Sequence, residues 1–144
     1  MRATSNTRRA FTLIELMVII IILAVLALIV IPHMLGAGRK AREASLKSQL
    51  QELRNALSKF EADCGDGPAR LEDLMTRPAE GSRGGAGTVL DVASWQGPYL
   101  DSPGRQLPKD PFTTRADWVY NPPTGQVHSS STMVSLRGDP YSNW

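Results

Sequence analysis

The sequence predicts an α+β fold in which one long N-terminal helix packs against a small antiparallel sheet formed by the last third of the chain. Three observations indicate this fold: an apolar run that ends at Ile31, an amphipathic stretch beyond it, and short extended segments between prolines near the C-terminus. At 144 residues the chain has room for one modest domain besides the apolar run.

The apolar run covers the 21 residues from Phe11 to Ile31 and contains one charged side chain, Glu15. As a helix it is about 31 Å long, which is enough to cross the hydrocarbon core of a bilayer. A carboxylate in such a run costs up to roughly 3 kcal/mol on insertion scales, less near its ends, so Glu15 is expected to need a partner. A plain membrane anchor with an incidental glutamate is the simpler alternative.

A secretory signal peptide is a second alternative for the N-terminus, because small residues at 35–37 resemble a cleavage site. The apolar run is longer than the usual signal-peptide core, and Glu15 interrupts its start. Arginines at positions 2, 8 and 9 place the N-terminus in the cytoplasm by the positive-inside rule.

Residues 32–63 are predicted to continue the helix. Pro32 removes a backbone donor, so we expect a kink there, although the helix ending at the membrane surface is an alternative. One apolar stripe follows at steps of four and three, formed by Leu46, Leu50, Leu53, Leu57 and Phe60. The stripe is expected to pack against the protein's own sheet, since barely three heptads argue against a coiled coil.

Residues 64–144 are predicted to form loops and a small sheet. A turn cluster at 63–68 ends the helix, and a helical turn is expected around 69–75. The glycine-rich loop at 78–87 lacks the strand-to-helix context of a phosphate-binding loop. Extended segments are expected at 118–120, 126–128 and 132–136, the first two joined as a hairpin through Asn121-Pro122-Pro123-Thr124-Gly125.

Composition argues against several function classes. The formal charge is +2, but without residues 1–10 there are 13 basic and 14 acidic side chains, so no nucleic-acid partner is expected. The lone Cys64 cannot form an intrachain disulfide, and two distant histidines make a zinc site improbable. No grouping suggests a catalytic site, and we do not expect an enzyme.

The N-terminal residues resemble those of the type IV pilin and pseudopilin superfamily. The resemblance rests on the leader ending Arg8-Arg9-Ala10, then Phe11-Thr12-Leu13-Ile14-Glu15 and the apolar run. It implies that a prepilin peptidase cuts between Ala10 and Phe11, although most members carry glycine before the cut, and that the Phe11 amine is then methylated. Glu15 of an incoming subunit would meet the Phe11 amine of a neighbour in a filament.

This resemblance divides the chain into four parts and implies a pilin-like fold. Residues 1–10 are a cytoplasmic leader that is removed, 11–31 a transmembrane and assembly helix, 32–63 its amphipathic continuation, and 64–144 a periplasmic region. The chain is thus expected to span the bacterial inner membrane once and to be extracted into a periplasmic filament.

The C-terminal motifs are similar to those of the major pseudopilin of type II secretion systems. They are Gly97-Pro98-Tyr99-Leu100, Lys109-Asp110-Pro111 and Trp118-Val119-Tyr120, in that order. The similarity implies a homopolymeric pseudopilus that drives protein export across the outer membrane. Its implied partners are other pseudopilins or minor pilins, the prepilin peptidase and an inner-membrane assembly platform. A surface type IV pilus for adhesion, motility or DNA uptake is the alternative, and a membrane-anchored enzyme a more distant one.

The end of the chain departs from that family, which usually has a calcium loop after the tyrosine-containing strand. Here no acidic residue occurs between Asp117 and Asp139, and a run of serines lies between them. Calcium needs several oxygen ligands, carboxylates prominent among them. We therefore assign no metal ligands and expect no cofactor, with calcium possible only by resemblance.

Overall fold

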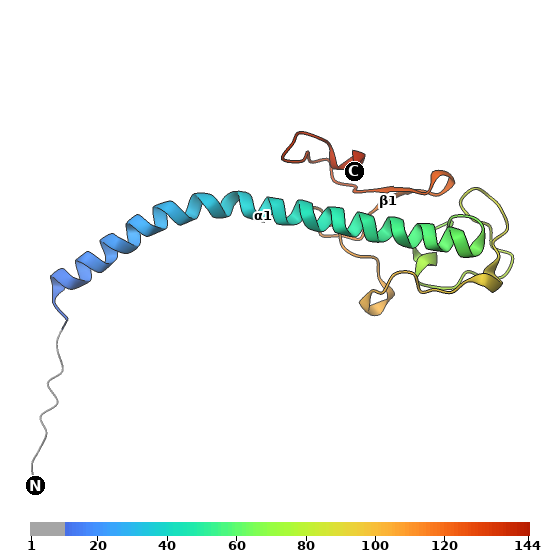
Figure 1. The fold of residues 1–144 in the computed structure, drawn as a ribbon, viewed down its shortest axis with the longest axis horizontal. Helices are drawn as coiled ribbons and strands as arrows, with labels where there is room; N and C mark the ends of the chain where they lie inside the picture. The colour runs from blue at the N-terminus through green and yellow to red at the C-terminus, as the bar shows by residue number, and fades with distance from the viewer. Residues whose placement is uncertain (1–10) are drawn as a thin grey trace, which may run out of the picture. The chain divides into compact units, whose positions relative to one another are not determined.

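The structure, a computed structural model of the chain, describes residues 11–144, with the side chains of residues 28–35 left aside. It contains two compact units, residues 1–39 and residues 40–144, and each is considered by itself. Helix α1, Leu13–Cys64, contributes to both units (Figure 1). The predicted leader, including Ala10, lies outside the described residues.

In the unit of residues 40–144, the amphipathic part of α1 supplies one side of the hydrophobic core. All five residues of the predicted stripe are buried, and Leu46, Leu53 and Phe60 have no exposed surface. They form one cluster with Trp118 and Val127 of the hairpin region. The prediction of an α+β fold with a long helix on a small antiparallel sheet is therefore confirmed.

The sheet is a single hairpin. Strands β1, Val119–Asn121, and β2, Gln126–His128, are antiparallel, with Tyr120 opposite Val127. The connection that the sequence predicts is present as a short 3₁₀ turn, Pro122–Thr124, closed by Gly125 at a φ of 65°. The other short 3₁₀ helices are η1, Leu71–Leu74, η2, Val92–Ser94, η3, Pro103–Arg105, and η5, Tyr141–Asn143.

The prediction of a third extended segment at 132–136 is wrong as far as the sheet is concerned. This stretch makes only an isolated bridge between Val134 and Pro140. The Ser135 hydroxyl oxygen accepts the N–H groups of Arg137 and Asp139, both at 3.1 Å, and so bends the chain back on itself. Serine favours such local turns because its side chain competes with strand pairing for backbone donors.

The glycine-rich loop at 78–87 is anchored by a buried carboxylate. Asp66 accepts the N–H groups of Gly67 at 2.7 Å, Ala86 at 3.3 Å and Thr88 at 3.1 Å. The Gly85 N–H also donates to the Gly67 carbonyl at 2.8 Å. The loop amides are thus used within the subunit, which agrees with the rejection of a phosphate-binding loop.

Two tyrosine hydroxyl groups tie loops to the helix and to the sheet, since Asp63 belongs to α1 and Tyr120 to β1. Tyr99 donates to the Asp63 carboxylate at 2.7 Å, and Tyr120 donates to the Pro68 carbonyl at 2.8 Å. Desolvation by burial is the main cause that raises the pKa of each phenol to about 12. For Tyr99 the hydrogen bond to Asp63 raises the pKa further, because it favours the protonated phenol.

Stability is expected to fall as the pH rises from 10 towards 12. Above the ordinary pKa of 10 the unfolded phenols ionise while the folded ones keep their protons, so alkali favours unfolding. Urea unfolding followed by circular dichroism at pH 8 to 12 measures this loss. A Tyr99→Phe, Tyr120→Phe double variant should be less stable at pH 8 and show a flatter decline, whereas an equally steep decline would contradict the assignment.

Candidate assembly site

The first turns of α1 carry an apolar surface that the described part of the chain leaves exposed. Every large apolar side chain from Phe11 to Leu26 is exposed, from 40% at Ile19 to 77% at Leu13. These residues follow one another without polar interruption after Glu15, so they cover all sides of the helix. A helix that is apolar all round is ordinarily buried in protein or lipid, which indicates an interaction surface.

Thr12 starts this helix. Its hydroxyl oxygen accepts the Glu15 backbone N–H at 3.3 Å, and its carbonyl accepts the Leu16 N–H at 3.2 Å. Thr12 and Glu15 therefore occupy the first and last positions of a capping-box sequence, Thr-x-x-Glu. The capping role of Thr12 was not predicted from the sequence, although the Thr-x-x-Glu spacing is the signal that could have shown it.

The Glu15 side chain is exposed, one turn from Phe11 along the chain. Among residues 11–144, its carboxylate has no hydrogen-bond or ion-pair partner in the single chain. Its place in the first turn is favourable for a negative charge because the helix dipole is positive there. The carboxylate is thus available to a cationic group supplied by another molecule.

Of the other predicted site residues, the structure describes Phe11 fully, Pro32 only in its backbone, and Ala10 not at all. Phe11 lies just before the helix with 71% of its surface exposed, and Ala10 is outside the described residues. Pro32 lies within the bounds of α1, and the kink predicted there stays a prediction. Among the described residues, no helix is long and apolar enough to cross a membrane.

Asp110 and Asp139 lie on either side of the position, after the tyrosine-containing strand, at which the resembled family usually has its calcium loop. Asp110 is fully buried, and its two carboxylate oxygens accept hydrogen bonds from Phe112, Thr113 and Ser129. Asp139 is the one acidic side chain after Asp117. Within the described part of the chain, no three His, Cys, Asp or Glu side chains lie close enough to share a metal ion.

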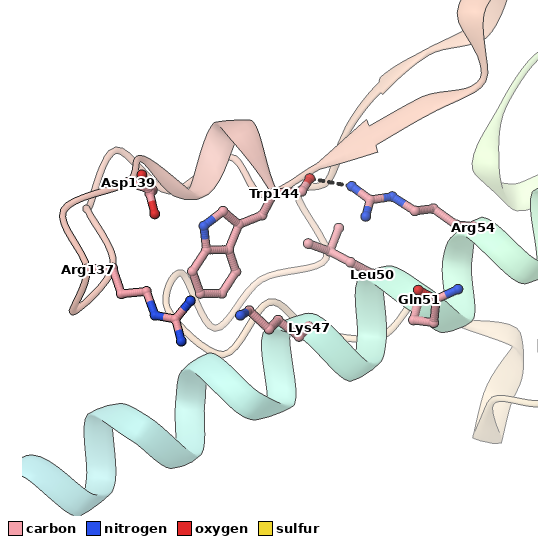
Figure 2. Close-up of a pocket in the computed structure, with 7 residues that line it drawn as sticks. All are labelled: Lys47, Leu50, Gln51, Arg54, Arg137, Asp139 and Trp144. Atoms are coloured by element: carbon pink, nitrogen blue, oxygen red, sulfur yellow. Dashed lines mark hydrogen bonds between the residues drawn. The ribbon is translucent and has the colours of Figure 1, made fainter.

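The C-terminal residues instead lie beside a groove on α1 with a volume of about 340 Å³. Figure 2 shows the Trp144 ring between Arg137 and Lys47, with the Trp144 backbone oxygen facing Arg54. The Lys47 ammonium lies 4.5 Å from the centroid of the Trp144 ring, a cation–π distance. These contacts were not predictable from the sequence, because their partners lie far apart along the chain.

Comparisons with known proteins agree with both parts of the resemblance. The family described as "Type II secretion system (T2SS), protein G" matches residues 33–140, and the "Prokaryotic N-terminal methylation motif" matches residues 5–31. No solved structure matches the chain.

Several curated relatives carry the name type II secretion system core protein G. The one from Pectobacterium carotovorum is 38% identical over 135 residues, which cover 92% of this chain and 77% of the relative. The one from Klebsiella michiganensis is 32% identical over 124 residues, 79% of this chain and 87% of the relative. The one from Vibrio cholerae is 34% identical over 116 residues, 74% and 80% of the two chains. The chain belongs to the type II secretion system protein G family.

Proposed function

We propose that this chain is the structural subunit of a type II secretion pseudopilus, a periplasmic filament that drives protein export across the outer membrane. The observation that carries the proposal is the apolar, exposed start of α1, which coincides with the N-terminal methylation motif. The family match supports a secretion filament over the surface pilus that the sequence left open. The proposed role is structural and needs no catalytic group.

In this proposal the precursor first spans the inner membrane once, with residues 64–144 in the periplasm. A prepilin peptidase removes residues 1–10, and the new amine of Phe11 is methylated. The subunit then passes from the membrane into the filament with the help of an inner-membrane assembly platform. Copies of this chain and other pseudopilins are the partners, and the apolar residues from Phe11 to Leu26 move from lipid into contact with neighbouring helices.

Charge pairing gives this assembly a defined register. Cleavage leaves a positive amine on Phe11 and a carboxylate four residues later at Glu15. Two opposite charges buried apart in an apolar environment are each unfavourable, and bringing them together offsets much of that cost. A subunit therefore gains most when its Glu15 carboxylate reaches the Phe11 amine of a subunit already in place.

Intact-mass measurement and N-terminal sequencing test the processing step. The full chain is expressed in membranes with and without a prepilin peptidase. With the peptidase, the expected product begins at N-methylated Phe11, because the leader and the Phe-Thr-Leu-Ile-Glu sequence match that chemistry. A product that keeps Met1 under both conditions, or one that begins after Ala37, would contradict the proposed function.

A further inference from the structure

The C-terminal segment, residues 126–144, packs on the rest of the subunit through its aromatic residues. Tyr141 is fully buried, and its ring stacks on Phe112 with the centroids 4.4 Å apart. Trp144 meets Tyr141 edge-on at 4.9 Å. Packing of this kind holds the C-terminal end of the segment, and the start of the segment and its turn at 135–139 are held by polar contacts.

Glu43 supplies the first polar contact. One oxygen of its carboxylate accepts the Leu136 backbone N–H at 2.7 Å and the Tyr141 hydroxyl at 2.9 Å. The carboxylate comes from α1, more than ninety residues earlier in the chain, so it ties the turn at 135–139 directly to the helix. Hydrogen bonds to a charged acceptor are among the stronger ones in proteins.

Arg54 supplies the second contact from the same face of the helix. Its guanidinium donates to the Val127 carbonyl at 3.2 Å and to the backbone oxygen of Trp144 (Figure 2). Glu43 and Arg54 are eleven residues apart, about three helical turns, so both reach the segment from one side. Together they hold the segment at its start, at its turn and at Trp144.

A buried pair, Asp110 and Ser129, supplies a third contact. The Ser129 hydroxyl donates to the Asp110 carboxylate, and the Ser129 oxygen accepts the Ser131 N–H at 3.0 Å. The other Asp110 oxygen accepts the Phe112 N–H at 2.7 Å. This carboxylate is buried, and Phe112, Thr113 and Ser129 occupy three of its about four acceptor sites, so a cation would have to displace these hydrogen bonds to be bound by both oxygens.

We propose that the Glu43, Arg54 and Asp110–Ser129 contacts close the C-terminal segment without a metal ion, so that its folding does not depend on calcium. The serine-built turn at 135–139 contributes to the same closure, since Ser135 also donates its N–H to the Asp139 carbonyl at 2.7 Å. The inference goes beyond the proposed function, because the closure is a property of the single subunit and does not depend on filament assembly.

Trypsin cleavage after Arg137 measures this closure, because the Arg137 side chain is exposed but its backbone is held in the turn by the Ser135 hydroxyl and must open to enter the protease. Full-length chain in detergent micelles is digested either in about 1 mM CaCl₂, a concentration at which even weak extracellular calcium sites bind the ion, or in EGTA. The product cleaved after Arg137 is followed by mass spectrometry. The expected rates in calcium and in EGTA agree within about twofold, as cleavage tracks the open population.

Variants test the contacts themselves. Ser129→Ala and Glu43→Ala are each expected to raise the cleavage rate by about tenfold in both solutions, because each removes a partner of buried or half-buried donors. Glu52→Ala, an exposed position on α1, is the matched control and should leave the rate unchanged. Glu43→Gln, which keeps an acceptor, should fall between Glu43→Ala and the unchanged chain, and circular dichroism verifies that each variant is folded.

Two results would overturn the proposal. In the first, calcium slows cleavage of the unchanged chain at Arg137 by about tenfold or more relative to EGTA, which would place a stabilising ion in the segment. In the second, Ser129→Ala and Glu43→Ala behave like Glu52→Ala, which would mean that these contacts do not hold the segment. Neither result would bear on the processing of Phe11, so the inference and the proposed function can fail separately.

Discussion

A chain carrying Glu15→Gln is expected to be cleaved normally after Ala10, but its filament yield should fall at least about tenfold below that of the unchanged chain. Glutamine has nearly the same shape and can still occupy the last position of a capping box, so the start of α1 is preserved. What it lacks is the negative charge that, in the proposed assembly, pairs with the Phe11 amine of a neighbour. A loss of only about 1.4 kcal/mol per contact gives a tenfold change in an equilibrium constant, and a filament repeats the contact in every subunit.

The measurement is the amount of sheared filament per cell, together with the intact mass of the membrane-bound subunit. Thr12→Ala is the matched control, because it removes the side chain that accepts the Glu15 N–H and leaves the carboxylate in place. Loss of such a cap costs about 1 kcal/mol of helix stability. If Glu15→Gln assembled normally while Thr12→Ala did not, the glutamate would be important for helix capping rather than for charge pairing.

Local patterns allowed much of the fold to be predicted from the sequence. The stripe from Leu46 to Phe60 is buried as expected, because a helix that packs on one side must repeat its apolar residues every three or four positions. The hairpin was also predictable, since prolines and Gly125 limit the backbone between β1 and β2 to a turn. In both cases the deciding interactions lie within a few residues of one another.

The contacts that hold the C-terminal segment could not be predicted in this way. Glu43 looks like an ordinary surface residue of a helix until its acceptor oxygen is placed beside Leu136 and Tyr141. Likewise, the segment at 132–136 reads as a strand, but Ser135 offers its oxygen to nearby N–H groups and a turn forms instead. The contacts of Glu43 depend on tertiary neighbours, which periodicity does not reveal. The Ser135 turn is local, but a search for strands by residue type does not weigh the hydrogen bonds that a serine side chain offers to nearby N–H groups.

The candidate assembly site likewise combines features that the sequence reveals with a contact that it does not. The apolar run and Glu15 were evident from the residues alone. Both are exposed in the single chain, which is consistent with a surface that contacts other molecules. The partner of Glu15 belongs to another molecule in the proposed assembly, so neither the sequence nor a single subunit contains it. The pairing therefore has to be tested in the filament, as the Glu15→Gln experiment does.

Gly85→Ala is expected to lower the free energy of unfolding by about 3 kcal/mol and the melting temperature by about 10 °C or more. A Cβ at this position would lie 2.1 Å from the Pro122 carbonyl oxygen and 2.5 Å from its carbon, both of them backbone atoms. The loop cannot simply move outward, because the Gly85 N–H donates to the Gly67 carbonyl. The substitution therefore forces apart the glycine-rich loop and the hairpin turn.

Thermal unfolding followed by circular dichroism measures this loss, with Ala86→Ser as the control at the neighbouring exposed position. An unchanged melting temperature for Gly85→Ala would mean that the loop and the hairpin turn do not approach as closely as described.

Filament yield then separates an effect on folding from an effect on assembly. Because Gly85→Ala acts through stability, its yield should recover at low growth temperature, where more of the subunit is folded. Glu15→Gln leaves the fold intact and removes a contact between subunits, so cooling should not restore its filaments.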